Sequence, residues 1–265
     1  MAVDFHENLI RIDPGLKIWR YMDIGKYESF LKDRGLFFCR ADKFSDPFEG
    51  SIPVREYEHR KIAFGANLDG NPISEERVKS DLNAISDSHK KLKSATIINC
   101  WHINEGESDA MWRLYLKDNE GIAIQSSPKL LFEALEKTSD SIRPSRVRYL
   151  NYEKEIWYNE KEYPHIHYNF IIPLIHKRAE YSHEREFRLL IELREAENDP
   201  HYWFRPPGIF GNSKMLTSIW RKLNYGEAKG KMIHFNVDSV VEKIILPPTS
   251  NEFVDMKIKQ MTRKY

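Results

Sequence analysis

The sequence is poor in cysteine. Only Cys39 and Cys100 occur among its 265 residues, and each lies in an apolar run typical of a β-strand. Two isolated cysteines fit buried thiols of a cytoplasmic protein better than a disulfide framework or a cysteine-based metal site. We therefore expect neither a disulfide nor a metal centre.

An excess of one charge and long apolar runs are also missing. Forty-one Lys and Arg stand against forty Asp and Glu, for a net charge of +1, so nucleic acid is not an expected partner. Every apolar run is far shorter than the roughly 20 residues of a membrane-spanning helix. The first residues also lack the basic and apolar regions of a signal peptide. With 41% hydrophobic and 31% charged residues, the composition predicts a globular cytoplasmic protein without a membrane segment.

Complete catalytic motifs are absent as well. The sequence has no Walker loop, no glycine-rich dinucleotide motif, no nucleophile elbow and no His-Glu-x-x-His. His165 and His167 suit a metal only in an extended segment, because side chains two residues apart diverge on a helix.

Strand-like and helix-like segments are interleaved without a regular β-α-β rhythm, which predicts an α+β fold. We expect a single domain over residues 1–265, with a mixed or mostly antiparallel central sheet flanked by helices. Apolar alternation predicts strands at residues 11–24, 36–40, 95–101, 121–125, 146–152, 186–193, 231–237 and 240–246. Capping residues and helical spacing predict helices at residues 26–34 (stopped by Gly35), 74–93, 108–117, 127–135, 163–181 (interrupted by Pro173) and 251–261.

Residues 201–230 form an irregular segment rich in aromatics, glycine and proline, including Tyr202, Trp203 and Phe204. Such a stretch is typical of an insertion or lid, or of a surface that binds a protein partner. A loop held against the core by its own aromatics is the alternative.

Three short polar-aromatic clusters are candidates for one shared site. The first, at residues 44–50, follows a predicted strand. Asp46 and Pro47 are typical of a structural turn, whereas Arg40 and Glu49 flank bulky apolar residues and need polar partners where they are buried. The cluster is therefore interpreted either as a turn or as a ligand contact.

The second cluster, at residues 111–115, places Met111 and Tyr115 on one helical face with Trp112 beside them. An aromatic and methionine stripe is typical of a core, and the alternative is a wall that stacks a planar ring.

The third cluster is residues 184–188. Strand alternation predicts that Glu184, Glu186 and Arg188 share one face. That face is either a solvated edge strand or a cleft in which Arg188 keeps one carboxylate ionised and leaves the other for chemistry. Lys177, just upstream, is a further candidate for an anionic ligand.

Together these clusters resemble a bacterial family of unknown function, domain family 2971. The likeness rests on Trp19-Arg20-Tyr21, on Phe44-Ser45-Asp46-Pro47-Phe48-Glu49-Gly50, on Met111-Trp112-Arg113-Leu114-Tyr115, on Gly121-Ile122-Ala123-Ile124, and on Lys177 ahead of residues 184–188. This sequence departs from the family pattern at Ser45, where asparagine is usual, and at Glu180, where an aromatic is common.

A further likeness is to ADP-ribosyltransferase folds, through an early-strand Arg20 and a late Glu-x-Glu at Glu184 and Glu186. It implies NAD as a substrate, with Arg20 on a phosphate, Trp112 stacking the nicotinamide and Glu186 stabilising an oxocarbenium-like transition state. The alternative is a non-catalytic module of a bacterial defence or stress system that binds a nucleotide or a protein through residues 201–230. The expected site comprises Glu186 and Glu184 as catalytic residues, with Arg20, Arg40, Asp46, Glu49, Trp112, Tyr115, Lys177 and Arg188 binding the ligand.

Overall fold

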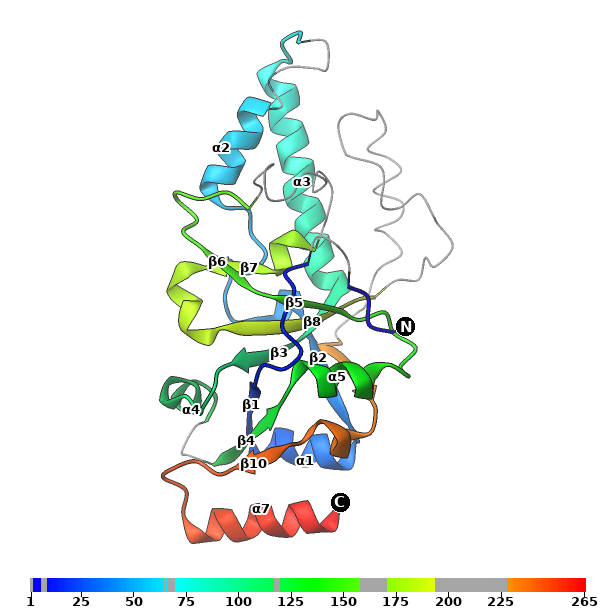
Figure 1. Ribbon diagram of the computed structural model, residues 1–265. Helices are drawn as coiled ribbons and strands as arrows, with labels where there is room; N and C mark the ends of the chain where they lie inside the picture. Colours follow the sequence, from blue (N-terminus) through cyan, green and yellow to red (C-terminus); the bar gives the residue numbers. More distant parts are fainter. Residues whose placement is uncertain are drawn as a thin grey trace.

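The structure is a computed structural model that describes residues 2–5, 9–63, 65, 70–116, 120–157, 171–193 and 228–265. The chain has an α+β fold built on a mostly antiparallel sheet (Figure 1), as the sequence predicts. The α-helices are α1 (Ile24–Lys32), α2 (Val54–Ala63), α3 (Glu75–Ala95), α4 (Asp109–Tyr115), α5 (Pro128–Leu135) and α7 (Glu252–Lys264). The strands are β1 (Ile18–Asp23), β2 (Gly35–Arg40), β3 (Thr96–Ile103), β4 (Gly121–Ser126), β5 (Arg143–Arg146), β6 (Arg148–Leu150), β7 (His176–Arg178), β8 (Glu186–Glu192), β9 (Gly230–His234) and β10 (Lys243–Ile245).

The main sheet is organised around β3 and splits along one of its edges. β8 pairs with the whole of residues 96–102 on one edge of β3. On the opposite edge, Ile98 pairs with Cys39 of β2, whereas His102 pairs with Trp19 of β1. Among the described strands, residues 99–101 of β3 have no ladder partner on that edge. β1 and β2 therefore diverge from β3 and leave a fork between them.

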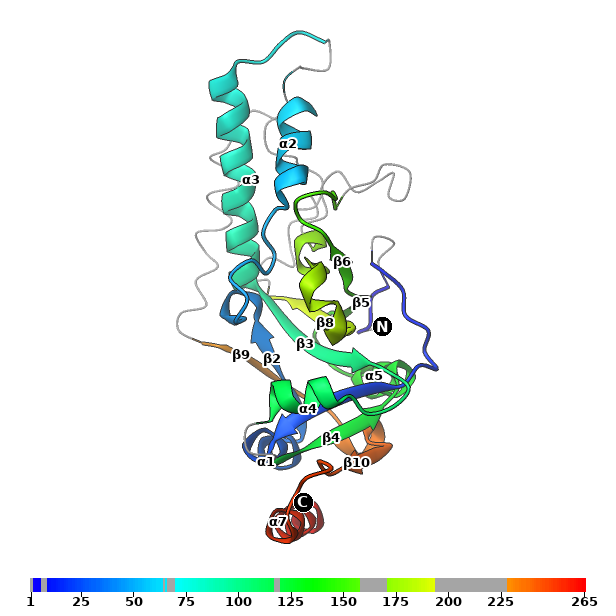
Figure 2. The ribbon, with the colours of Figure 1, turned by 90° about the vertical axis from the view of Figure 1, so that its left-hand side faces the viewer.

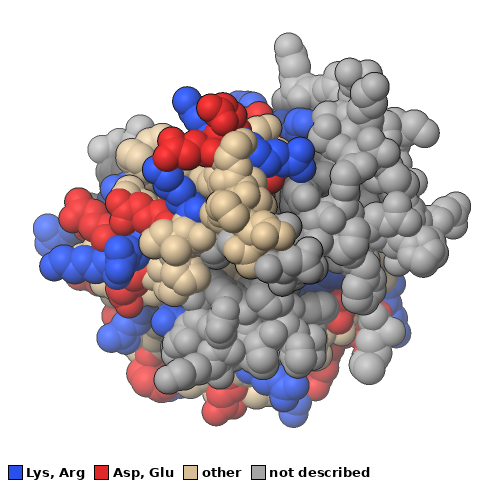
Figure 3. All heavy atoms as spheres, turned by 90° about the horizontal axis from the view of Figure 1, so that it is seen from above, with Lys and Arg blue, Asp and Glu red and all other residues tan. Residues whose placement is uncertain are grey.

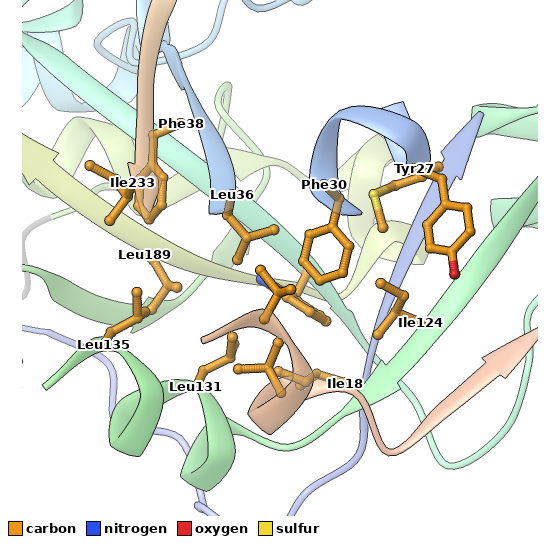
Figure 4. Close-up of a cluster of buried hydrophobic side chains, with 14 of the residues drawn as sticks. Ile18, Tyr27, Phe30, Leu36, Phe38, Ile124, Leu131, Leu135, Leu189 and Ile233 are labelled. Carbon is orange, nitrogen blue, oxygen red and sulfur yellow. The ribbon is translucent and has the colours of Figure 1, made fainter. Parts of the chain in front are cut away.

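One face of the sheet carries the largest hydrophobic core. It is covered by α1, α5 and α7, whose apolar faces pack against inward side chains of the strands. Figure 4 shows Ile18, Leu36, Ile124 and Leu189 from four strands pointing toward Leu131 of α5 and toward the aromatic rings of α1. Helix capping fixes the local structure, since Asn251 accepts a hydrogen bond from the backbone N–H of Val254 at the start of α7.

The opposite face carries two smaller clusters with open space between them. α4 packs on β1 and β4 through Met111, Trp112 and Leu116. The start of β3 and the end of α3 form the other cluster with Leu174 and Leu190. α2 and α3 project away from the sheet side by side as an arm (Figure 2). Seen from above, the described part of the surface carries interspersed basic and acidic side chains (Figure 3).

Several predicted boundaries need correction. Gly35 does not stop α1, because Arg34 takes the left-handed conformation (φ 50°) instead. Gly35 begins β2, where an added Cβ would meet the carbonyl oxygen of Ile233 at 2.5 Å. α2 is a helix that the sequence reasoning missed.

The predicted helix at residues 163–181 is wrong over its described part, which holds 3₁₀ turns and the strand β7. The rest of that helix, His165, His167 and residues 201–227 lie outside the described residues.

Candidate functional site

A cavity of about 880 Å³ lies at the fork in the sheet. Its lining includes Tyr21, Met111 and Cys100 from the side of the two smaller clusters, and also Met22, Phe30 and Trp101 of the main core. Its floor includes Tyr21, Phe37, Cys39, Cys100 and His102 of β1, β2 and β3. The walls come from four segments of the chain: Asp23, Gly25, Lys26, Ser29 and Phe30; Phe44, Ser45, Asp46 and Glu49; Met111, Leu114 and Tyr115; and Lys177, Tyr181, Glu184 and Glu186. A volume in this range suits a small molecule of nucleotide size.

Arg20 occupies the fork in the sheet and lines the cavity. Its Nη1 donates to the carbonyl oxygen of Cys100 at 2.6 Å and to Oδ1 of Asn99 at 3.2 Å. Asn99 in turn donates to the carbonyl oxygen of Phe37 on β2. These two side chains replace the missing ladder bonds and tie β1, β2 and β3 together. Burial lowers the pKa of Arg20 from its ordinary value.

Arg188 is the centre of a buried ion network behind the cavity wall. Its guanidinium is fully buried, at 0% exposure. Nη1 donates to Oε1 of Glu49 and to the carbonyl oxygen of Leu174, and Nε donates to Oε2 of Glu186, each at 2.7 Å. Arg188 therefore joins the first and third clusters of the sequence directly.

Lys177 joins Glu184 to Glu186. Its Nζ donates to Oε2 of Glu184 at 2.6 Å and to Oε1 of Glu186 at 2.8 Å. Burial and the adjoining Glu186 carboxylate raise the pKa of Glu184 to about 7. Burial opposes ionisation of Glu186 too, but Arg188 and Lys177 outweigh it and hold the pKa of Glu186 well below its usual range. One carboxyl of the pair is thus fixed in the ionised form and the other titrates near neutral pH.

The predicted geometry of this pair was wrong in one respect. Glu184 is not on the strand, because it ends a 3₁₀ helix over Ala179–Glu184, and β8 begins at Glu186. The solvated edge-strand interpretation also fails, since β8 lies between β3 and β5 and all three ionisable side chains are buried.

The turn at residues 44–50 is structural and also lines the cavity. Oδ1 of Asp46 accepts the backbone N–H of Phe48 at 3.0 Å, as expected of an Asx turn. The same oxygen accepts from Nη2 of Arg178 at 3.1 Å. The Arg178 guanidinium lies over the rings of Phe48 and Tyr181, at 4.7 and 5.1 Å from their centroids. The turn interpretation is therefore confirmed, and the contact with a ligand stays a prediction for the residues of the turn that line the cavity.

Two aromatic residues of the second cluster, Trp112 and Tyr115, have different environments. Trp112 is 4% exposed, packs edge-on against Tyr21 at 4.8 Å and donates from Nε1 to Glu107. It is not among the described residues that line the cavity. Tyr115 does line the cavity, is 39% exposed and lies near the carboxylates. Burial and nearby Cys100 and Glu186 raise the pKa of its hydroxyl.

Arg40 lies apart from the cavity, and this position does not suit the ligand-binding role predicted for it. Its Nε and Nη2 donate to the carboxylate of Asp42 at 2.9 and 2.8 Å, and Nη1 donates to the carbonyl oxygen of Ala228.

Nothing in the sequence gave reason to expect Cys100 and Tyr181 in the lining, and it pointed to His102 only as part of an aromatic pair with Trp101 at a strand end. The Nδ1 of His102 contacts the carbonyl oxygen of Glu184 at 2.7 Å, and burial lowers the pKa of the ring. A neutral ring that donates from Nδ1 satisfies both observations. Strand alternation alone places Cys100 and His102 on one face with Ile98, but it cannot tell that a cavity lies above them.

Comparison with known proteins gives one match. The model of a family described as a protein of unknown function (DUF2971) matches residues 111–189. This region contains the second and third clusters and Lys177, so the resemblance inferred from the sequence is confirmed over that part of the chain. No curated protein and no solved structure matches the chain. The likeness to ADP-ribosyltransferases receives no support from these comparisons.

Two further observations concern the described ranges only. No group of three or more His, Cys, Asp or Glu side chains within them is arranged to hold a metal ion. No helix there is long and apolar enough to cross a membrane.

Proposed function

We propose that the protein is an enzyme that binds a nucleotide-sized ligand in this cavity and breaks an N-glycosidic bond, with NAD as the substrate to test first. The observation that carries the proposal is the pair of adjoining carboxyls with opposite protonation behaviour, Glu184 and Glu186, in one cavity of suitable size. Titratable groups whose pKa values are pushed apart are typical of acid–base sites.

The chemistry requires only these two groups and a nucleophile. The bond between C1′ of the ribose and the nicotinamide nitrogen breaks, and its electron pair returns to the ring, which leaves neutral. The ionised carboxylate of Glu186 stabilises the positive charge that develops on the ribosyl carbon. The oxygen of water or of an acceptor hydroxyl bonds to C1′, and its proton passes to Glu184 acting as general base.

Other lining residues suit the remaining parts of such a ligand. Arg20 is fixed in the fork by two hydrogen bonds and offers a cation to a phosphate. Tyr115 stacks with Tyr21, with ring centroids 6.5 Å apart and 17° between the planes, and presents an aromatic wall to a planar ring. Trp112 does not serve as this wall because Tyr21 and the α4 helix cover it.

Release of nicotinamide from NAD, followed by chromatography, tests the proposal with three variants. Glu184→Gln should lower turnover by roughly 100-fold or more, because it removes the general base. Glu186→Gln should abolish turnover. Glu180→Gln changes an exposed residue of the same 3₁₀ helix and should leave turnover unchanged.

A melting curve for each variant separates loss of chemistry from loss of fold. Undiminished turnover in folded Glu186→Gln contradicts its role. Binding of NAD without any turnover by the wild-type protein points instead to the non-catalytic nucleotide-binding module.

A further inference from the structure

The residue between the two carboxyls has an unusual backbone. Arg185 has φ 40° and ψ 54°, the left-handed conformation that residues other than glycine, asparagine and aspartate seldom adopt. Its side chain is exposed and makes one hydrogen bond, from Nη1 to Oδ1 of Asn104 at 3.2 Å. Arg185 is not among the described residues that line the cavity. The unusual feature of Arg185 is therefore its backbone and not its guanidinium.

This backbone conformation determines where Glu184 lies. In an extended strand, side chains two residues apart share a face but stand roughly 6–7 Å apart along the chain. Because Arg185 is left-handed, the 3₁₀ helix ends at Glu184 and β8 begins at Glu186, with Arg185 as the only residue between them. As a result, the Glu184 and Glu186 carboxylates converge on one Lys177 amine, at 2.6 and 2.8 Å.

Four hydrogen bonds hold the two peptide groups that flank Arg185. The N–H of Arg185 donates to the carbonyl oxygen of Ser182 at 3.3 Å, and its carbonyl oxygen accepts from the N–H of Ile103 at 2.9 Å. The N–H of Glu186 donates to the hydroxyl of Tyr149 at 2.8 Å. The carbonyl oxygen of Glu184 contacts Nδ1 of His102 at 2.7 Å. Two of these bonds run to the end of β3, so the turn is fixed to the central strand of the sheet.

We propose that Arg185 is a positioning residue whose left-handed backbone, rather than its side chain, places the Glu184 carboxyl beside Glu186 and Lys177. The catalytic consequence rests on the function proposed for Glu184, whereas the structural claim stands without it. Unusual backbone conformations of this kind persist only where the surrounding structure holds them in place, and they cluster at functional sites.

Three substitutions separate backbone from side chain. Arg185→Asn and Arg185→Val both remove the guanidinium, but asparagine tolerates the left-handed region and β-branched valine does not. Arg185→Gly allows the conformation freely. We expect the Asn and Gly variants to keep turnover within about twofold of wild type. The Val variant should lose at least about tenfold in kcat, because small misplacements of a catalytic group are costly.

Arg34→Val is the matched control. Arg34 is also left-handed, with φ 50°, but it lies at the end of α1 and does not line the cavity. Its substitution should lower the melting temperature much as Arg185→Val does while leaving kcat unchanged. Equal turnover in the Asn and Val variants of Arg185 overturns the proposal, whether both are active or both inactive.

A second measurement does not depend on turnover. The carboxyl of Glu184 can be titrated by carbon-13 NMR and assigned by its loss in Glu184→Gln. The groups that face it are Lys177 from β7, Glu186 from β8 and the hydroxyls of Tyr115 from α4 and Tyr149 from β6. In Arg185→Val the carboxyl should move into solvent and titrate near an ordinary glutamate, while Arg185→Asn should titrate like wild type.

An unchanged titration in Arg185→Val refutes the positioning role. If the titration of Glu184 shifts in Arg185→Val but the wild-type protein does not turn over NAD, the positioning role stands and only the proposed function is refuted.

Discussion

Replacing Arg188 with methionine should destabilise the protein severely. Arg188 is fully buried and compensates two carboxylates, Glu49 at 1% and Glu186 at 6% side-chain exposure. Removing one partner of a buried ion pair typically costs about 3–5 kcal/mol, because the remaining charge has no compensation. Glu186 keeps Lys177 at 2.8 Å, whereas Glu49 loses the cation to which it is paired, so we expect a loss within that range. This is a large share of the roughly 5–15 kcal/mol by which a protein of ordinary stability is folded.

The loss of stability caused by Arg188→Met should become smaller as the pH falls. In the wild-type protein the pKa of Glu186 is depressed, so its contribution to stability is present above about pH 4.5 and is lost as the pH falls through the folded value. Without Arg188, Glu186 loses the strongest of the charges that lower its pKa, so its folded pKa should rise and protonation then relieves part of the penalty. The difference in stability between wild type and variant should therefore shrink between pH 7 and pH 4.

Urea denaturation at several pH values measures this difference. Arg178→Met is the matched control, because Arg178 also pairs with a buried carboxylate but its own side chain is 29% exposed. It should cost less than Arg188→Met, because Arg178 is partly solvated and Asp46 keeps its hydrogen bond from the N–H of Phe48. A loss below about 1 kcal/mol in Arg188→Met, or a loss that does not change with pH, would refute the reasoning.

Two other predictions concern the site and the sheet. The turnover of NAD should rise as the pH increases through about 7, since a general base must be deprotonated; a pH profile of kcat/KM checks this, and a fall over the same range contradicts the role of Glu184. Gly121→Ala should cost about 1–3 kcal/mol in urea denaturation, because an added Cβ would overlap the carbonyl oxygen of Met22 on β1 and a methyl group of Leu116; an unchanged midpoint would show that β4 shifts freely.

Local signals in the sequence were reliable where one residue type has one structural use. The predicted helices at residues 74–93, 108–117, 127–135 and 251–261 begin at capping residues. Each of these, Ser74, Ser108, Ser127 and Asn251, accepts a hydrogen bond from the backbone of the first helical turn. The Thr-Ile-Ile run lies in the strand predicted at residues 95–101, and the observed strand β3 pairs with three others. Continuous apolar sequence is informative here because both faces of such a strand must be buried.

Features that depend on contacts between distant segments could not be predicted from the sequence in the same way. The fork depends on which strands pair with β3, and that is set by tertiary packing rather than by the pattern of any one strand. The exposure of Glu184, Glu186 and Arg188 could not be deduced either, since the same alternation suits a solvated strand and a cavity wall. The left-handed Arg185 has no sequence signal because arginine ordinarily avoids this conformation.

The buried network also allows stability and function to be separated. Well-packed apolar groups often stabilise a protein as much as a buried ion pair or more. Replacing Glu49 and Glu186 with leucine and Arg188 with methionine together removes two negative charges and one positive charge. The remaining Lys177 still pairs with Glu184 at 2.6 Å, so no buried charge is left without a partner.

We expect this triple variant to be several kcal/mol more stable than Arg188→Met alone, by roughly the 3–5 kcal/mol that an uncompensated charge costs, and to be inactive. Urea denaturation and nicotinamide release measure the two properties in parallel. A triple variant as unstable as the single one would mean that the network holds the fold by its geometry. A triple variant that is stable but inactive would show that the charged groups of the network are needed for the chemistry of the cavity and not for stability.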